Sequence, residues 1–173
     1  MTMVGVRRAL PDDIAAVIDL FVAVVEEGRW LGTQGPVDRD AQYERFMHEA
    51  SSDDAVSLVA VVDDEIVGHV RVELAPYKVA GLGMMVDARW RGRGVGGALV
   101  RSAIDAARDL GAHKVTLQVW PHNTAARRLY LRYGFVEEGV LRRHYPRRNG
   151  ELWDAVIMGL VLDETSPGCS LSA

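Results

Sequence analysis

A glycine-rich segment, Arg91-Gly-Arg-Gly-Val-Gly-Gly97, is the feature that most constrains how this chain can fold. It follows an apolar segment expected to be a strand, and it leads into a helix expected over Val95–Leu110. The first N–H groups of a helix lack internal partners and point out of its positive end, and glycines let an anion approach them. Arg91 and Arg93 add positive charge to the same turn. The segment therefore predicts a pyrophosphate site.

The glycine-rich segment also matches part of a dinucleotide-binding pattern. Gly92, Gly94 and Gly97 satisfy G-x-G-x-x-G, but a dinucleotide-binding fold has this motif in its first strand–helix unit and an acidic residue ending the next strand. Here the motif lies in the middle of the chain, and the next strand ends at Gln118-Val-Trp-Pro121 without an acid. The Gly-Lys-Ser/Thr of a phosphate-binding loop is absent. A purely structural glycine turn is the remaining alternative.

Length and composition are typical of one globular domain. The 173 residues suit a single domain, which we expect over residues 1–163, followed by a disordered Ser/Pro/Gly-containing tail over residues 164–173. Cys169 is the only cysteine, so one chain can form no disulfide and no thiolate metal cluster, and we expect no metal. A net charge of −4 argues against a nucleic-acid partner, and no apolar stretch has membrane-spanning length. We therefore expect a cytoplasmic protein.

Hydrophobic periodicity predicts a mixed order of strands and helices. Asn149-Gly150 is a strong hairpin signal between the last two strands. The predicted elements are a strand at Val4–Val6, helices over Pro11–Gly28 and Asp38–Ala50, strands over Val56–Val62, Ile66–Leu74 and Gly81–Val86, a helix over Val95–Leu110, a strand over Val115–Val119, a helix over Asn123–Tyr133, and two strands within Phe135–Leu162. This order predicts an α/β (α+β) domain with a mixed, mostly antiparallel central sheet of about seven strands flanked by about four helices.

Two motifs carry a family resemblance. Arg91-x-x-Gly94-x-Gly96 resembles the acetyl-CoA signature of the GNAT superfamily of N-acetyltransferases. Downstream, the segment from Asn123 to Phe135 is similar to that superfamily's second motif, N-x-x-A-x-x-L-Y-x-x-x-G-F. The resemblance covers about Val56–Leu162, and the closing hairpin looks like the branch of small-molecule and amino-acid N-acetyltransferases. It implies an acyltransferase with acetyl-CoA as co-substrate, a sheet splayed at the acetyl-CoA site, and a homodimer as one assembly to test.

The resemblance also implies a set of cofactor-binding residues. The glycine-rich turn would anchor the pyrophosphate, and freed backbone groups of the preceding strand would bind the pantetheine arm and the thioester oxygen. Gly81 and Gly83 interrupt that strand, which independently indicates a bulge or a close backbone approach. The implied residues are Met84, Met85, Val86, Arg91, Gly92, Arg93, Gly94, Val95, Gly96, Gly97, Asn123 and Tyr130. Asn123 is equally suited to cap a helix.

Candidate catalytic residues follow from the proton transfers that amine acetylation needs. Tyr130 is our candidate general acid, because it is the motif's tyrosine and a phenol with an ordinary pKa of about 10 stays protonated at neutral pH; the alternative is a core tyrosine. Some relatives have a glutamate base where this chain has Gln118. Glu73, on the polar face of a strand, is our candidate base, unless it has a solvated or structural role. His122 and a water relay are the other candidates.

Two segments are candidates for the acceptor side. Trp30–Gln34 forms either a pocket wall or an ordinary loop. A basic stretch in the closing hairpin either attracts an acceptor carboxylate or is simply exposed: Arg142, Arg143, His144, Arg147 and Arg148. The resemblance thus implies transfer of acetyl to a primary amine of a small molecule, with an amino acid favoured, by direct attack. The alternatives are an acetyltransferase of protein N-termini, of the ribosomal-protein type, and a non-catalytic acyl-CoA-binding sensor.

Overall fold

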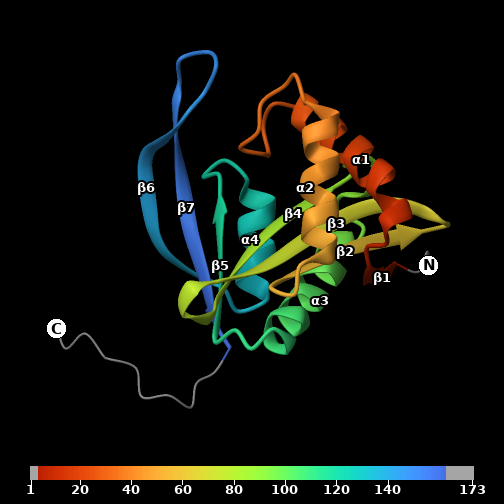
Figure 1. Cartoon of the computed structure of the whole chain (residues 1–173). Coiled ribbons are helices and arrows are strands. Elements are labelled where there is room, and N and C mark those ends of the chain that lie inside the picture. The colour runs from red at the N-terminus through yellow and green to blue at the C-terminus, as the bar shows by residue number, and fades with distance from the viewer. Residues whose placement is uncertain (1–3, 163–173) are drawn as a thin grey trace.

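The strands and helices follow one another in the predicted order in the computed structural model, which describes residues 4–162 (Figure 1). The elements are β1 (Gly5–Arg8), α1 (Ile14–Glu26), α2 (Arg39–Ser51), β2 (Ala55–Val62), β3 (Glu65–Ala75), β4 (Val79–Val86), α3 (Val95–Asp109), β5 (Lys114–Val119), α4 (Thr124–Arg132), β6 (Val136–Pro146) and β7 (Leu152–Val161). The expected tail over residues 164–173, with Cys169, lies outside the described residues. In residues 4–162, no helix is long and apolar enough to span a membrane.

The seven strands form one sheet in the order β1-β2-β3-β4-β5-β7-β6. Every neighbouring pair is antiparallel except β4 and β5, which run parallel, so the predicted mixed sheet is confirmed. The parallel pair is short, because only Val79–Gly81 is paired with Lys114–Thr116. Beyond Gly81, β4 continues beside β3 as far as Val86, while β5 turns away with β7. The sheet therefore opens between β4 and β5, as Figure 1 shows.

Helices cover both faces of the sheet. Helices α1 and α2 cover one face and α3 and α4 the other (Figure 1). Helices α1 and α3 each bury an apolar stripe at helical spacing; in α3 the stripe includes Leu99 and Ala103, both fully buried. Gly68 of β3 lies beneath α3, where a Cβ would stand 2.9 Å from the Leu99 Cδ1 atom. This close approach fixes the start of α3 against the sheet next to the opening.

The closing hairpin of β6 and β7 reaches past the end of β5. Its turn is closed by two backbone hydrogen bonds: the Arg147 N–H donates to the Glu151 carbonyl at 2.8 Å, and the Gly150 N–H donates to the Arg147 carbonyl at 2.9 Å. Gly150 has a φ of 86°, a conformation that glycine adopts without strain. The hairpin signal in the sequence is therefore confirmed. The pairing of β5 with β7 ends at Val119 opposite Val156, so the hairpin tip extends beyond it.

Candidate active site

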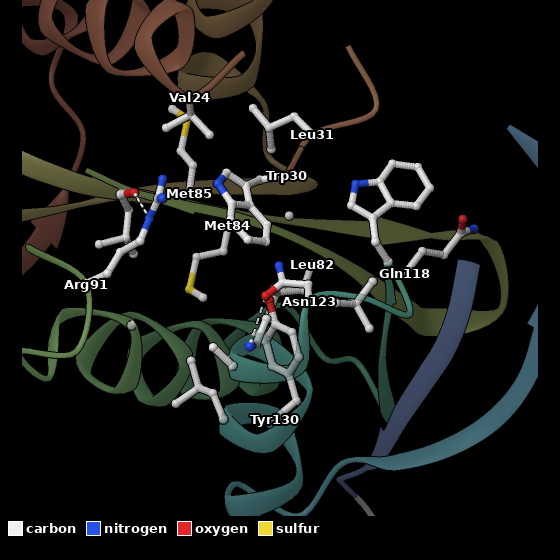
Figure 2. A pocket seen from close by; sticks show the side chains of 18 of the residues that line it. Val24, Trp30, Leu31, Leu82, Met84, Met85, Arg91, Gln118, Asn123 and Tyr130 are labelled. Carbon is white, nitrogen blue, oxygen red and sulfur yellow. Dashed lines mark hydrogen bonds between the residues drawn. The ribbon is translucent and has the colours of Figure 1, made fainter. Parts of the chain in front are cut away.

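A cavity of about 620 Å³ occupies the opening between β4 and β5. We call one side of it the glycine wall, made by Leu82–Val86 of β4, the turn at 91–97 and α4. The opposite side, the aromatic wall, consists of Trp30, Leu31, Trp120 and Tyr145. Figure 2 shows Tyr130 and Asn123 on the glycine wall facing Trp30 and Leu31 across the cavity. The two walls come from distant parts of the chain, so only the folded sheet brings them together.

The glycine-rich turn ends in an open helix N-terminus. Gly92 and Gly94 have φ values of 73° and 88°, in the left-handed region, and Gly94 is the N-cap residue of α3 without a capping side chain. The first hydrogen bond into the helix runs from the Ala98 N–H to the Gly94 carbonyl, at 3.1 Å. The N–H groups of Val95, Gly96 and Gly97 have no acceptor within residues 4–162. Three free donors at the positive end of a helix suit an anion.

The other two glycines of the turn allow α3 and α4 to approach closely. A Cβ at Gly96 would lie 3.0 Å from the Leu129 Cδ2 atom, and one at Gly97 would lie 2.9 Å from the Tyr133 hydroxyl. The side chain of Val95, by contrast, is fully buried, so only its backbone can face a ligand. The sequence pattern indicates one anion site for the whole segment. It does not distinguish glycines that leave room for a ligand from glycines that let α3 pack closely against α4.

Arg91 is engaged within the protein. Its guanidinium donates to the two carboxylate oxygens of Glu27, at 2.7 and 2.6 Å, and its Nε donates to the Val86 carbonyl at 3.1 Å. The hydrogen bonds from Arg91 lower the pKa of Glu27 below its ordinary value. Arg93 lies over the Trp90 ring, 5.2 Å from its centroid, outside the cavity lining. The charge of Arg91 is therefore offset by Glu27, whereas Arg93 keeps its charge beside the turn. The link to Glu27 had no signal in the sequence.

The opening leaves backbone groups of β4 without strand partners. The N–H of Asp87 donates to the Val67 carbonyl of β3 at 2.9 Å. Because N–H and C=O groups alternate in direction along an antiparallel strand, Met85 also faces β3, whereas Met84 and Val86 face the opening. The Val86 carbonyl receives the Arg91 side chain, which leaves Met84 with free backbone groups toward the cavity. Met84, Met85 and Val86, which the resemblance implied as cofactor-binding, thus differ in whether their backbone groups are free. Those of Met85 pair with β3 within the sheet.

Tyr130 combines burial with access to the cavity. Its side chain lies against Phe135, with 5.6 Å between ring centroids, and the residue is 6% exposed. Burial raises the pKa of its hydroxyl well above the ordinary value of 10.0. Tyr130 nevertheless lines the cavity, with its ring rising from α4 toward Asn123 (Figure 2). Asn123 both lines the cavity and caps α4, since its Oδ1 accepts the Ala126 N–H at 3.2 Å.

The candidate bases lie in different places. Glu73 pairs with Arg71 and stands beside Gly81, where β4 and β5 are still joined, so the structure does not bring it to the cavity. Glu73 as base therefore has no geometric support. His122 is also outside the cavity lining; its Nε2 lies 2.9 Å from the Arg29 carbonyl. Gln118 does line the cavity. A strand's polar face can be predicted from its alternation, but the point where two strands part cannot.

The aromatic wall contains residues that the sequence pattern did not single out. Trp120 and Tyr145 contact each other edge to face, with ring centroids 5.0 Å apart, and the Tyr145 hydroxyl donates to Gln118 Oε1. The loop over Trp30–Gln34 could be a pocket wall or an ordinary loop by sequence; its first three residues, Trp30 to Gly32, line the cavity, and Gln34 does not. The position of Trp120 just before the cap of α4 was the only signal for it in the sequence. Within the basic stretch, Arg147 is buried and the other four residues are exposed.

Comparisons with known proteins address the family. A family model described as "Acetyltransferase (GNAT) family" matches residues 15–135. An L-amino acid N-acetyltransferase of Escherichia coli (strain K12) is 38% identical over 109 residues, which are 60% of this chain and 67% of that protein. A ribosomal protein bS18-alanine N-acetyltransferase of Salmonella typhimurium is 30% identical over 105 residues, 61% of this chain and 70% of that one. A solved acetyltransferase of the GNAT family from Streptococcus pneumoniae matches with a TM-score of 0.82 and 26% identity, over 92% of this chain and 100% of that one.

Proposed function

Since the chain belongs to the acetyltransferase (GNAT) family and is therefore an acetyl-CoA-dependent acetyltransferase, we propose that it acetylates the primary amine of a small molecule, with an amino acid favoured, by direct attack. One observation carries the proposal. The cavity between β4 and β5 has free helix N–H groups, free strand backbone and a buried tyrosine hydroxyl on one wall, and an aromatic enclosure on the other. Such a cavity can hold an acyl donor on one side and an apolar amine on the other.

The glycine wall fits acetyl-CoA. The N–H groups of Val95, Gly96 and Gly97 would bind the pyrophosphate, and a Cβ built at Gly94 would meet no atom within 4 Å, which leaves space in front of them. The free backbone groups of Met84 would bind the pantetheine arm. When bound, acetyl-CoA supplies an activated acetyl thioester. Because the protein's net charge is −4, local donors rather than the overall field must hold this anion.

Tyr130 would act as the general acid. Its raised pKa keeps the hydroxyl protonated at neutral pH, so it can donate a proton to the departing sulfur. The acceptor amine must lose its own proton before attack, and among the described residues no carboxylate and no histidine lines the cavity. The amine would therefore give its proton to water, with no side chain acting as base.

The nature of the cavity supports a small apolar acceptor. Its second side is formed by Trp30, Leu31 and Trp120, and within residues 4–162 the charged residues in its lining are Arg91 and Arg132. A polyamine would find no acidic group among these described residues, whereas an amino acid with an apolar side chain could bury that side chain against the indoles. The 38% identity to an L-amino acid N-acetyltransferase points the same way.

A protein N-terminus is the second candidate acceptor. It is favoured by the 30% identity to a ribosomal protein bS18-alanine N-acetyltransferase over 70% of that protein. A chain that binds acetyl-CoA without turnover is the third candidate, because Gln118 stands where some relatives have a glutamate. The first two candidates differ in which acceptor leads to release of CoA, and the third releases none, so one assay separates them.

The test is a panel of amines assayed for release of free CoA. The panel contains free amino acids, their amides, a polyamine, and a peptide that begins with alanine. We expect turnover with apolar amino acids and little with the polyamine. Turnover confined to the peptide would replace our proposal with N-terminal acetylation. A silent panel, together with calorimetric binding of acetyl-CoA, would support the sensor.

A further inference from the structure

Arg147, at the tip of the β6–β7 hairpin, is buried without a carboxylate partner. It is 7% exposed, and no carboxylate lies within 4.0 Å of its guanidinium in residues 4–162. Burial lowers the pKa of Arg147, and the nearby acid, Glu151, is exposed and accepts a hydrogen bond from Trp153 Nε1 at 2.8 Å. A buried charge is costly unless other groups stabilise it. The groups that contact this guanidinium are therefore informative.

Neutral groups surround the Arg147 guanidinium. Its Nη1 donates to the carbonyls of Gly32, at 3.0 Å, and Leu31, at 3.4 Å. Its Cζ lies 4.3 Å from the Trp153 ring centroid and 5.8 Å from that of Trp120. Carbonyl oxygens and indole faces attract a cation but do not cancel its charge. Glu151 attracts this cation from beyond contact distance and offsets its charge only in part. Positive charge is thus retained directly behind the aromatic wall, to which Leu31 and Trp120 belong.

The same contacts hold the aromatic wall in place. The loop after α1 is joined to the hairpin turn through Arg147 and also through Arg148, whose N–H donates to Gln34 Oε1 at 2.9 Å. Arg148 also donates to the Gly35 carbonyl from its guanidinium. These contacts connect residues more than a hundred positions apart in the chain. At its start the loop is also held by His122, whose Nε2 lies 2.9 Å from the Arg29 carbonyl, and the hairpin holds the part from Leu31 to Gly35.

We propose that Arg147 determines acceptor specificity: it positions the Trp30–Gly32 loop, and its guanidinium, which no carboxylate of residues 4–162 contacts, favours acceptors that carry a carboxylate. The inference rests on the proposed function and adds the residue that selects among small amines. Arg147 is outside the cavity lining, so it acts as a positioning residue and through its field rather than by contact with the reacting atoms. A carboxylate approaching the aromatic wall is stabilised by the nearby cation, and an uncharged amide is not.

The test compares a free amino acid with its amide as acceptors, for example leucine and leucinamide. For each enzyme we take the ratio of kcat/KM for the amino acid to kcat/KM for the amide. The two amines differ in basicity, but this difference is the same for every variant and cancels when the ratios are compared. We expect R147M to lower kcat/KM for the amino acid at least about tenfold more than for the amide. R147K keeps the charge and should restore much of that preference. R101M removes an exposed charge from α3 and should leave the ratio unchanged.

Folding and donor binding are checked in the same variants. Calorimetric affinity for acetyl-CoA should stay close to the wild-type value, because the glycine wall is intact. If R147M does not fold, R147K and R147Q provide the same comparison with smaller changes. An unchanged ratio, with or without an equal loss of kcat/KM for both acceptors, would overturn the proposed role of Arg147 but leave the proposed function standing. If the wild-type enzyme acetylates neither acceptor but binds acetyl-CoA, the acceptor class is wrong and the proposed function falls with it.

Discussion

The two walls of the cavity are built in different ways. The glycine wall uses backbone groups from segments that are each continuous in the sequence, the turn at 91–97 and the helix that follows Asn123. The aromatic wall uses side chains from the loop at Trp30, from Trp120 and from the hairpin, held together by contacts across more than a hundred residues. Backbone groups suit the donor, because acetyl-CoA is the same in every reaction. Side chains suit the acceptor, because they can be exchanged when the acceptor amine differs. Substitutions on the two walls should therefore separate donor effects from acceptor effects.

The largest effect is expected at Tyr130, on the glycine wall. Removing its hydroxyl in Y130F should lower kcat about 100-fold or more, the usual contribution of a general acid. The calorimetric affinity for acetyl-CoA should hardly change, because the ring that contacts Phe135 remains. Y133F, at the C-cap residue of the same helix, is the matched control, since Tyr133 is outside the cavity lining. Equal losses in turnover and affinity would show that Tyr130 is only structural.

A substitution at Gly94 tests the donor site itself. In G94A an L-residue must adopt a φ of 88°, at a cost of about 1 kcal/mol, and a methyl group enters the space before the free N–H groups. G111A, at the other end of α3, introduces similar strain with a φ of 77° and equally open surroundings. Both variants should lose similar thermal stability. Only G94A should lose acetyl-CoA affinity in calorimetry, by about tenfold.

Tyr145 tests the opposite wall. Y145F removes the hydrogen bond to Gln118, which contributes about 1 kcal/mol to stability. Because both residues line the cavity, losing it should loosen the aromatic wall and raise the acceptor KM by at most about fivefold. The acetyl-CoA affinity should be unaffected. Y77F, at a tyrosine that is 91% exposed, is the control. A change in acetyl-CoA affinity in Y145F would mean that the two walls are not independent.

The smallest effect is expected at the link between the walls, the pair of Glu27 and Arg91. The lowered pKa of Glu27 means that its ionised form stabilises the fold above the unfolded pKa of about 4.5, and that this stability is lost as the pH falls through the folded pKa. Because the pair is partly exposed, E27Q should lose about 0.5 kcal/mol at pH 7. Thermal unfolding should show this difference shrinking below pH 4.5. E26Q, at an exposed neighbour, should show no such trend.

Sequence alone could predict the fold and much of the glycine wall, because both depend on local patterns. Strand alternation and helical spacing are properties of short segments. Caps are local too: Asn123 caps α4 as the sequence indicates, and Asp38, where the second helix is predicted to begin, accepts the Ala41 N–H at 3.0 Å through its Oδ1. The glycine turn is visible in the sequence because glycines stand where the backbone is left-handed, at Gly92 and Gly94, and they adopt that conformation without strain. Each of these inferences needs no knowledge of what lies across the fold.

The aromatic wall and the charge arrangement could not be predicted, because they depend on long-range contacts. Nothing near Arg91 in the sequence indicates Glu27, and nothing near Arg147 indicates Gly32. Glu73 is a second example of a position that depends on long-range contacts. Its strand face was assigned from alternation, but its place relative to the opening depends on the register of β3 with β4 and of β4 with β5. Register across a parallel pair is set by tertiary structure.

The short parallel pairing of β4 with β5 joins the two strands only at the closed end of the opening, where they can rotate relative to each other. Three paired positions hold the two strands together, and any rotation there is magnified along the strands toward the other end. Ala80, fully buried in this pairing, lies outside the cavity lining. A larger residue at that position would spread the strands, so the longest acyl chain that the enzyme can transfer should be tunable from a site that meets neither substrate.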